Sequence, residues 1–367
     1  MMRIADLTGR EAYAQERIRL MSELRESDDV YRRFQLIVNG PALFNAVVTG
    51  VELGVFDFLS GNGRATAAEL AGFTAMEPHK MRVLLLGLTA SGLVTKTGDG
   101  YTNHPVAERL LAATGPESWR HILRSWKTLY YPAFYHMTAA LTAGTNSTIS
   151  AHEGTEGTLY ERLAHDAELA DIFHAAMSAF TLQTMPGLIE HLDVAQSRHL
   201  LDVGAGAGTN CAHLLGAHEN LTATLLDLPN VMDMAKTGLP DDLAGRVTFY
   251  SADMLADPFP AGADHVLFSH VLDTVSAEQA VLLLAKAFEV LPSGGKVSVY
   301  GFSAADDERG GPLAARLSLY LNVLATGRGM AWPVPEMVGW LRQAGFAEID
   351  TTDDLPYEHA LVVGTKP

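Results

Sequence analysis

The sequence predicts two domains: a mainly α-helical N-terminal domain of winged-helix type and a C-terminal α/β domain with a Rossmann-like, mostly parallel sheet. The 367 residues, 48% of them hydrophobic, are enough for two cores. Helical periodicity followed by a hairpin pattern marks the first domain. From His199 onward, short apolar strands alternate with helical segments, as in doubly wound sheets. The predicted divisions are an extension over 1–35, the winged helix over 36–115, a helical linker and pocket region over 116–190, and the α/β domain over 191–367.

The composition argues against nucleic acid or anionic membrane as partners. The formal net charge is −17, and no block of Lys or Arg overrides it. Cys211 is the only cysteine, which excludes an intramolecular disulfide and fits a reducing cytoplasm. The N-terminus lacks the apolar core of a signal peptide, and no run of 18 uncharged apolar residues is present. We therefore expect a cytoplasmic protein without a membrane span.

The first domain is predicted element by element. Residues 1–33 carry alternating charges and predict a solvated helix or a partner-wrapping arm. Apolar residues at helical spacing follow over 36–59. Thr66 and Glu69 form a capping box, and a second helix is expected over 77–91. Residues 93–96 and 101–103 then flank a Thr-Gly-Asp-Gly turn, which predicts the hairpin of a winged helix.

Residues 104–190 are predicted to be helical and are rich in aromatic side chains between Trp119 and Tyr135. The polar stretch 144–157 is expected to be a loop. The second domain should contain strands at 199–203, 223–226, 247–250, 265–269, 296–300 and 360–363.

A glycine-rich turn after the first of these strands predicts a nucleotide-like ligand. The run LLDVGAGAG at 200–208 ends a buried strand and turns into a helix, and its glycines let the backbone approach a ligand closely. Asp227 ends the second strand, 227 − 204 = 23 residues after the first glycine, where a carboxylate can accept hydrogen bonds from two ribose hydroxyls. NAD-binding folds share that feature. Asp253 at the third strand tip adds a second acid.

These motifs resemble those of the small-molecule O-methyltransferases of plants and bacteria that carry an N-terminal winged-helix dimerisation domain. The resemblance runs from about residue 36 to residue 363 and includes 51–57, 84–94, 291–296 and 340–346. It implies S-adenosylmethionine (SAM) as the cofactor and a homodimer whose N-terminal helices interlock and help to wall the acceptor pocket. The cofactor-binding residues that it implies are Gly204, Gly206, Asp227, Leu228, Asp253, Met254 and Ser269.

The sequence departs from this family where the family places its catalytic base. The usual signature after the fourth strand is aliphatic-Leu-His-Asp-Trp, with the His as base, whereas residues 270–275 here read HVLDTV. Alignment places Asp273 at the position of the base. The two acids that often support that His would lie near Gly301 and Gly329, and both positions are glycine here. The resemblance therefore implies another base, no base, or different chemistry on the same scaffold.

Three side chains are candidates for the base. Asp273 and His270 lie three residues apart and share a face if the segment is helical, and His136 is a further candidate. The alternatives are a helix cap for Asp273, a packing role for His270, and a pocket-wall or surface position for His136. Together the three could ligate a metal ion, but no spacing motif supports one, so no metal is predicted.

The acceptor is expected to be a small aromatic molecule. Trp126 and Tyr130 can stack on a planar substrate. The resemblance places Met177 over the substrate and the pocket floor between Tyr320 and Trp332, although core packing is the favoured role for Met177. Arg328 could hold a substrate carboxylate or face water.

Three functions remain open from the sequence. The first is methyl transfer to a phenol, at its oxygen or at the ortho ring carbon, because a phenolate is nucleophilic at both atoms. The second is a tailoring enzyme that binds SAM without methylating its substrate. The third is a SAM-sensing DNA-binding regulator, which the acidic charge disfavours because the helix over 77–91 offers only Lys80 and Arg82 as cations.

Overall fold

A computed structural model describes residue 15 and residues 29–309 and 311–367 of the chain. Most of the predicted N-terminal arm over 1–33 therefore lies outside the described residues. The chain forms two compact units, 1–113 and 114–367.

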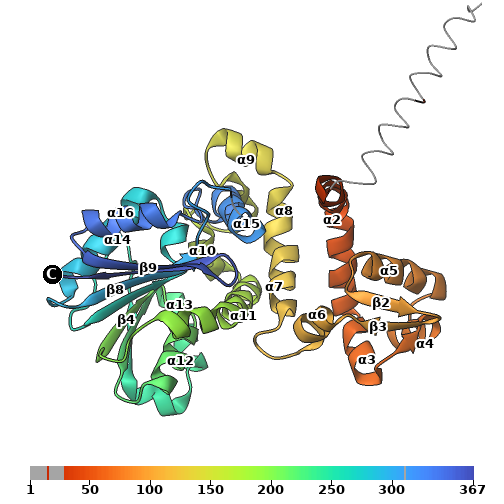
Figure 1. Cartoon of the computed structure of the whole chain (residues 1–367), viewed down its shortest axis with the longest axis horizontal. Coiled ribbons are helices and arrows are strands. Elements are labelled where there is room, and N and C mark those ends of the chain that lie inside the picture. The colour runs from red at the N-terminus through yellow and green to blue at the C-terminus, as the bar shows by residue number, and fades with distance from the viewer. Residues whose placement is uncertain (1–14, 16–28, 310) are drawn as a thin grey trace, which may run out of the picture. The chain divides into compact units, whose positions relative to one another are not determined.

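The first unit is a helical domain with a small sheet, as predicted (Figure 1). Gly54, with φ 71°, separates the first two helices within the apolar pattern over 36–59. Thr66 and Glu69 form the expected capping box at the third helix. A two-residue strand also joins the predicted hairpin to make a three-stranded antiparallel sheet of order β1-β3-β2. The elements are α2 (Asp29–Glu52), α3 (Val55–Asn62), β1 (Ala65–Thr66), α4 (Ala67–Thr74), α5 (Pro78–Ala90), β2 (Val94–Thr97), β3 (Gly100–Asn103), α6 (Pro105–Ala107) and η1 (Glu108–Ala112).

Helix α2 carries an unusual number of exposed apolar side chains. Phe34, Leu36 and Ile37 are 53%, 58% and 74% exposed within this unit. By length and composition alone, α2 is also apolar enough to cross a membrane, a test that the core helix of a globular protein can pass as well, and the expectation of no membrane span stays a prediction. The stretch 34–51 of this helix carries no charge, but the amides of Gln35, Asn39 and Asn45 interrupt it, so it is not a continuous apolar run.

The second unit begins with a helical region. Two of its segments, η2 and η7, are single wide turns of the π type, a geometry that is frequent at functional sites. The predicted loop over 144–157 contains a short 3-10 helix. The elements are α7 (Trp119–Ser125), η2 (Trp126–Tyr130), α8 (Tyr131–Phe134), α9 (Met137–Ala143), η3 (Ser147–Ala151), α10 (Leu159–Arg162), η4 (Leu163–His165) and α11 (Ala167–His191).

A seven-stranded sheet of order β6-β5-β4-β7-β8-β10-β9 forms the centre of the second unit. The first five strands in this order are parallel, and β10 runs antiparallel to both of its neighbours. The Rossmann-like fold is thus confirmed. The strands are β4 (His199–Val203), β5 (Thr222–Asp227), β6 (Val247–Ser251), β7 (His265–Ser269), β8 (Lys296–Phe302), β9 (Ala347–Leu355) and β10 (His359–Thr365).

Helices cover both faces of this sheet (Figure 1). Alternate residues of β4 face opposite layers: Leu201 packs with α14 and α16, and Leu200 packs with α12 and α13. The helices after the first strand are α12 (Thr209–Ala217), α13 (Pro229–Gly238), η5 (Asp241–Arg246), η6 (Leu272–Thr274), α14 (Ala277–Val290), α15 (Pro312–Tyr320), η7 (Leu321–Ala325) and α16 (Val334–Gln343). This arrangement brings the carboxyl ends of the parallel strands to one edge, where ligands bind in such sheets.

Candidate active site

A cavity of about 360 Å³ lies within the second unit and runs from the glycine-rich turn to the aromatic helices. Its size is typical of small-molecule sites. It brings together nearly all of the predicted cofactor and substrate residues. Its lining includes Trp126, Tyr130, Met177, Gly204, Asp227, Leu228, Asp253, Met254, Ser269, His270, Asp273 and Tyr320.

The glycine-rich turn and Asp227 form one end of this cavity. Gly204 has φ 69°, and a Cβ there would lie 2.6 Å from Val271 Cγ2, so the position requires glycine. The Asp227 carboxylate accepts hydrogen bonds from Gly206 N and Leu228 N, both at 2.8 Å. Burial raises the pKa of Asp227, and these two N–H groups lower it. Gly206 itself is not among the lining residues, and its role is to hold the turn against Asp227.

The tip of β6 provides the second acid. Asp253 is exposed, and its Oδ1 accepts a hydrogen bond from Leu255 N at 2.8 Å. Its own N–H donates to Asp257 Oδ2 at 2.9 Å. Half-buried Met254 follows, so a polar and an apolar side chain stand next to each other at this strand tip.

A hydrogen-bonded chain starts at the tip of β7 and fixes the state of His270. His359 Nδ1 donates to Tyr357 O at 2.8 Å, which leaves its Nε2 as an acceptor. That acceptor lies 2.8 Å from His270 Nε2, so His270 Nε2 carries the hydrogen. His270 Nδ1 then accepts from Ser269 Oγ at 3.2 Å, and Ser269 Oγ accepts from Asn210 Nδ2 at 3.0 Å.

This chain engages both ring nitrogens of His270 and needs both histidines neutral. Burial lowers the pKa of His359 to about 4 and the pKa of His270 well below its usual value. His270 also has φ 58°, a strained conformation for a residue of this kind. The side chain is therefore held in place and has no free nitrogen for an acceptor's proton.

Asp273 has the opposite character. It lies in η6, is only 6% exposed and lines the cavity. Its Oδ1 is buried and has no hydrogen-bond partner among the described residues. Burial raises the pKa of Asp273 to about 7, while backbone N–H groups of the turn lower it. A base is most effective when its pKa lies near the working pH, and this carboxyl meets that condition. The 3-10 turn, with His270 in a left-handed conformation before it, replaces the helix on which the two side chains were expected to share a face.

The two glycines at the positions of the family's supporting acids both adjoin Asp273. A Cβ at Gly301 would lie 3.6 Å from Asp273 Oδ2. One at Gly329 would lie 2.3 Å from the Asp273 carbonyl oxygen, which leaves no room for a side chain. The packing around η6 therefore excludes an acid at Gly329 as the structure stands.

The pH dependence follows from the raised pKa of Asp273, if it acts as the base. Only the ionised carboxylate can accept a proton, and the pKa is about 7. We expect kcat/KM to rise about tenfold per pH unit below pH 7 and to level off above it. Initial rates with labelled SAM across this range, at saturating cofactor, measure the profile. A profile that stays flat from pH 5 to 8 would exclude a base with this pKa.

Stacked aromatic rings form the other end of the cavity. The rings of Tyr130 and Tyr320 stack at 4.0 Å between centroids, and Trp126 stacks on Tyr130 at 6.4 Å. Burial raises the pKa of Tyr130, Tyr160 and Tyr320, and the Asp273 charge adds to the effect at Tyr160. The three phenols thus lie together, and Tyr160 is the one that lies near the carboxyl of Asp273.

Two predicted site residues lie elsewhere. His136 is exposed at the start of α9, with its ring 5.1 Å from that of Tyr135, and does not line the cavity. Trp332 packs edge-on against Trp340 at 5.2 Å in the core beneath α16. The aromatic run before His136 turns at α8, which directs its last residues to the surface. Arg328 reaches the cavity rim but is exposed, and its Nε donates to Thr326 O at 3.4 Å.

Three lining or supporting residues were not predicted: Tyr160, Arg316 and His359. Tyr160 lies inside the capping box of Thr158 and Glu161, a Ser/Thr-x-x-Glu signature that could have located the helix. Arg316 is the cavity's partly buried cation on α15. His359 reaches His270 only because β10 lies beside β8, and no local signal reveals that. Among the described residues, no cluster of His, Cys, Asp and Glu could hold a metal ion.

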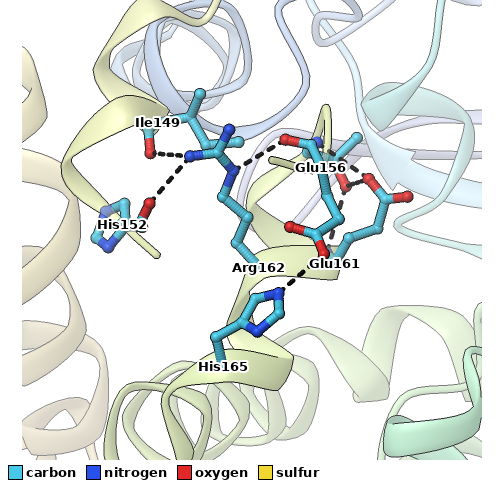
Figure 2. Close-up of polar contacts among 7 residues, drawn as sticks. Ile149, His152, Glu156, Glu161, Arg162 and His165 are labelled. Carbon is cyan, nitrogen blue, oxygen red and sulfur yellow. Dashed lines mark hydrogen bonds and ion pairs between the residues drawn. The ribbon is translucent and has the colours of Figure 1, made fainter. Parts of the chain in front are cut away.

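Hydrogen bonds hold the stretch over 144–157 next to Thr158 and Tyr160, which line the cavity. Figure 2 shows Arg162 donating to three backbone carbonyls, those of Ile149, His152 and Glu156, each at 2.9 Å. At the other end, Asn146 Nδ2 lies within 3.3 Å of the carbonyls of Gly157, Leu324 and Ala325. None of the residues 144–157 lines the cavity itself.

Replacing Arg162 by Met should loosen this wall. Three carbonyls would lose their donors, and we expect the free energy of unfolding to fall by about 2–4 kcal/mol. The KM for the acceptor should rise while the affinity for the cofactor is kept. Arg124→Met is the matched control, because that side chain is 61% exposed and makes only a 3.5 Å ion pair with Glu168. Thermal unfolding of both variants tests this, and equal melting temperatures would contradict it.

The fold and cavity together define a class: an enzyme with a Rossmann-like domain whose strand tips hold an adenosine-containing cofactor beside an aromatic pocket. The comparisons give the family. The family model described as "O-methyltransferase domain" matches residues 134–347, and the model described as "O-methyltransferase dimerisation domain" matches residues 36–113. The chain belongs to this O-methyltransferase family and is a SAM-dependent methyltransferase.

Several named methyltransferases are similar to this chain. L-tyrosine C(3)-methyltransferase of Streptomyces lavendulae is 28% identical over 335 residues, 90% of this chain and 91% of that protein. Tetracenomycin polyketide synthesis 8-O-methyl transferase TcmO of Streptomyces glaucescens is 31% identical, over 88% of this chain and 93% of that protein. The crystal structure of the SAM-dependent methyltransferase SibL, in its apo form, has a TM-score of 0.79 at 32% identity and covers 91% of this chain and 99% of that one.

Proposed function

We propose that this enzyme methylates a phenolic small molecule of natural-product metabolism, at the hydroxyl oxygen or at the ring carbon beside it, with Asp273 as the general base. The observation that carries the proposal is the buried carboxyl of Asp273, which lines a cavity that is aromatic on one side and reaches the glycine-rich turn on the other, and whose Oδ1 has no hydrogen-bond partner among the described residues. The similar proteins act on a tyrosine carbon in one case and a polyketide oxygen in another, and both kinds of acceptor are aromatic.

The residues at the strand tips fit SAM. Gly204 and Asp227 both line the cavity, and the turn at Gly204, where Val271 leaves no room for a Cβ, places the backbone beside the Asp227 carboxylate. Asp227 would hold the ribose, Asp253 and Met254 the adenine, and Leu228, Gly206 and Ser269 would shape the remaining contacts. SAM supplies an electrophilic methyl group on a sulfonium.

The chain's own task is to activate and orient the acceptor. A phenol has a pKa near 10, so an ordinary Asp is about six pKa units too weak a base; burial of Asp273 reduces that difference to about three. Tyr130 and Trp126 would stack on the acceptor ring, and the His270–His359 pair would hold the η6 turn that carries Asp273. Which acceptor atom lies in line with the methyl group decides between oxygen and carbon.

Methyl-labelled SAM with a panel of phenolic acids, aromatic amino acids and polyketide phenols tests the proposal. Mass spectrometry detects transfer, and NMR of the product locates the label. Label on oxygen or on the ortho carbon supports the proposal and settles the atom. Bound cofactor with no transfer to any member of the panel would favour the tailoring enzyme that does not methylate.

We further propose a homodimer formed through the first unit. Its exposed apolar side chains on α2 need a cover in water, and the match to a dimerisation domain begins at residue 36, within that helix. Light scattering of the purified protein should give twice the chain mass. Ile37→Glu, at a 74% exposed position, should shift the protein to monomer, and a wild-type protein of single-chain mass would contradict the proposal.

A further inference from the structure

We propose that Arg316 forms a carboxylate subsite, so that the acceptor is a phenolic acid bound with its hydroxyl toward Asp273 and its carboxylate toward α15. This inference rests on the proposed function and names the substrate class. It begins from a cation in the cavity, Arg316, that has no counter-ion among the residues the structure describes.

The guanidinium of Arg316 is fixed in orientation by aromatic rings. Its Cζ lies 4.6 Å from the ring centroid of Trp126 and 5.6 Å from that of Tyr130. Contacts of this kind hold the planar group by its face and leave its N–H edge free for a ligand. Arg316 is half-buried and lines the same cavity as Asp273.

One N–H group of this edge, that of Nε, lacks a partner among the described residues, whereas another hydrogen-bonds the Tyr130 side chain. Arg316 Nε is buried and makes no hydrogen bond among the described residues, and no carboxylate of those residues lies within ion-pair distance of Arg316. Glu161 also lines the cavity, but its carboxylate accepts hydrogen bonds from Thr158 N and Oγ1, at 3.0 and 2.7 Å. A buried donor without a partner on a charged group costs free energy, and a carboxylate can accept from Nε and a neighbouring N–H together.

The aromatic stack connects this subsite to the proposed base. Arg316 lies over Tyr130, and Tyr130 stacks on Tyr320 at 4.0 Å. The charges of Tyr130 and Asp273 both raise the pKa of Tyr160, which lies near them. A flat acceptor lying along these rings would therefore have one end at the carboxyl and the other at the guanidinium. This arrangement selects aromatic acids over neutral phenols of the same shape.

Equilibrium binding to the protein loaded with S-adenosylhomocysteine (SAH) tests the subsite without requiring turnover. The probes are L-tyrosine and 3-hydroxybenzoate, each beside its primary amide, measured by calorimetry. We expect at least one acid to bind about 10- to 100-fold more tightly than its amide. In Arg316→Met, which keeps an apolar chain on Trp126, this preference should disappear while the affinity for the amide is kept. Arg316→Lys should retain part of it, because charge remains without the planar fork.

Arg328→Met is the matched control, because Arg328 is an exposed cation at the rim of the same cavity. It should keep the preference for acid over amide. The inference would be overturned if the wild type bound acid and amide equally, or bound neither at millimolar concentration. It would also be overturned if Arg328→Met lost the preference for the acid while Arg316→Met retained it. Failure of methyl transfer to the same probes would count against the proposed function and leave these binding results standing.

Discussion

Asp273→Asn should lower kcat/KM by about 100- to 10,000-fold, the usual contribution of a positioned general base. Asn keeps the size of the side chain and its hydrogen-bonding contacts with the turn, but it cannot accept the acceptor's proton. The rise in rate through pH 7 should disappear together with the activity. Steady-state rates with an acceptor from the labelling experiment measure both effects, and the affinity for SAH in the same variant shows whether the cofactor end is intact.

Stability separates this role from a structural one. Folding raises the pKa of Asp273 from about 4 to about 7. Ionising it in the folded protein therefore costs stability, and the cost grows as the pH rises from the unfolded pKa to the folded one. Asp273→Asn removes that cost, so its melting temperature at pH 8 should equal or exceed that of the wild type. A variant that melts well below the wild type, with activity falling only in proportion to unfolded protein, would mark Asp273 as a structural residue.

His270→Asn is the informative companion variant. Asn tolerates the left-handed conformation of this position, φ 58°, but breaks the contact with His359. We expect lower stability and a lower rate, with the rise through pH 7 retained because Asp273 is still present. If His270→Asn lost the pH dependence while Asp273→Asn stayed active, His270 and not Asp273 would be the base.

Asp227→Ala should weaken binding of SAH by about 100-fold or more, since a carboxylate that accepts two hydrogen bonds contributes several kcal/mol. The substitution also removes the 2.8 Å anchor of Gly206 and so loosens the glycine-rich turn. Calorimetric titration with SAH measures the change. Asp253→Asn is the control within the same site: that side chain is exposed, and we expect about a tenfold effect. An unchanged Kd for SAH in Asp227→Ala would show that the strand tips do not form the cofactor site.

Much of the fold could be predicted because apolar periodicity dominates its elements. Strands β4 and β7 begin and end at the predicted residues, since both are continuous buried runs between polar turns. Strand β9 was missed because its sequence, AEIDTTDDL, is an exposed, acidic edge without an apolar face. The capping box at Thr66 and the helix over 77–91 were predictable from local hydrogen-bonding chemistry alone.

The site was predictable only where its residues end strands. Asp227, Asp253 and Ser269 follow apolar runs, and a parallel sheet gathers such positions at one edge. His359 and Arg316 come from elements whose place depends on the three-dimensional packing, and they therefore carried no local signal. His136 and Trp332 were predicted to lie in the site but do not line the cavity. Proximity in sequence to an aromatic run is therefore not enough to place a side chain there.

The crystal structure of the enzyme with SAH and a phenolic acid that it methylates would test the central claim most directly. We expect the acceptor hydroxyl within about 2.6–3.2 Å of an Asp273 carboxylate oxygen, the ring against Tyr130, and the carboxylate on the N–H edge of Arg316. An acceptor whose hydroxyl lies away from Asp273, or whose ring lies outside the stack of Trp126, Tyr130 and Tyr320, would contradict it.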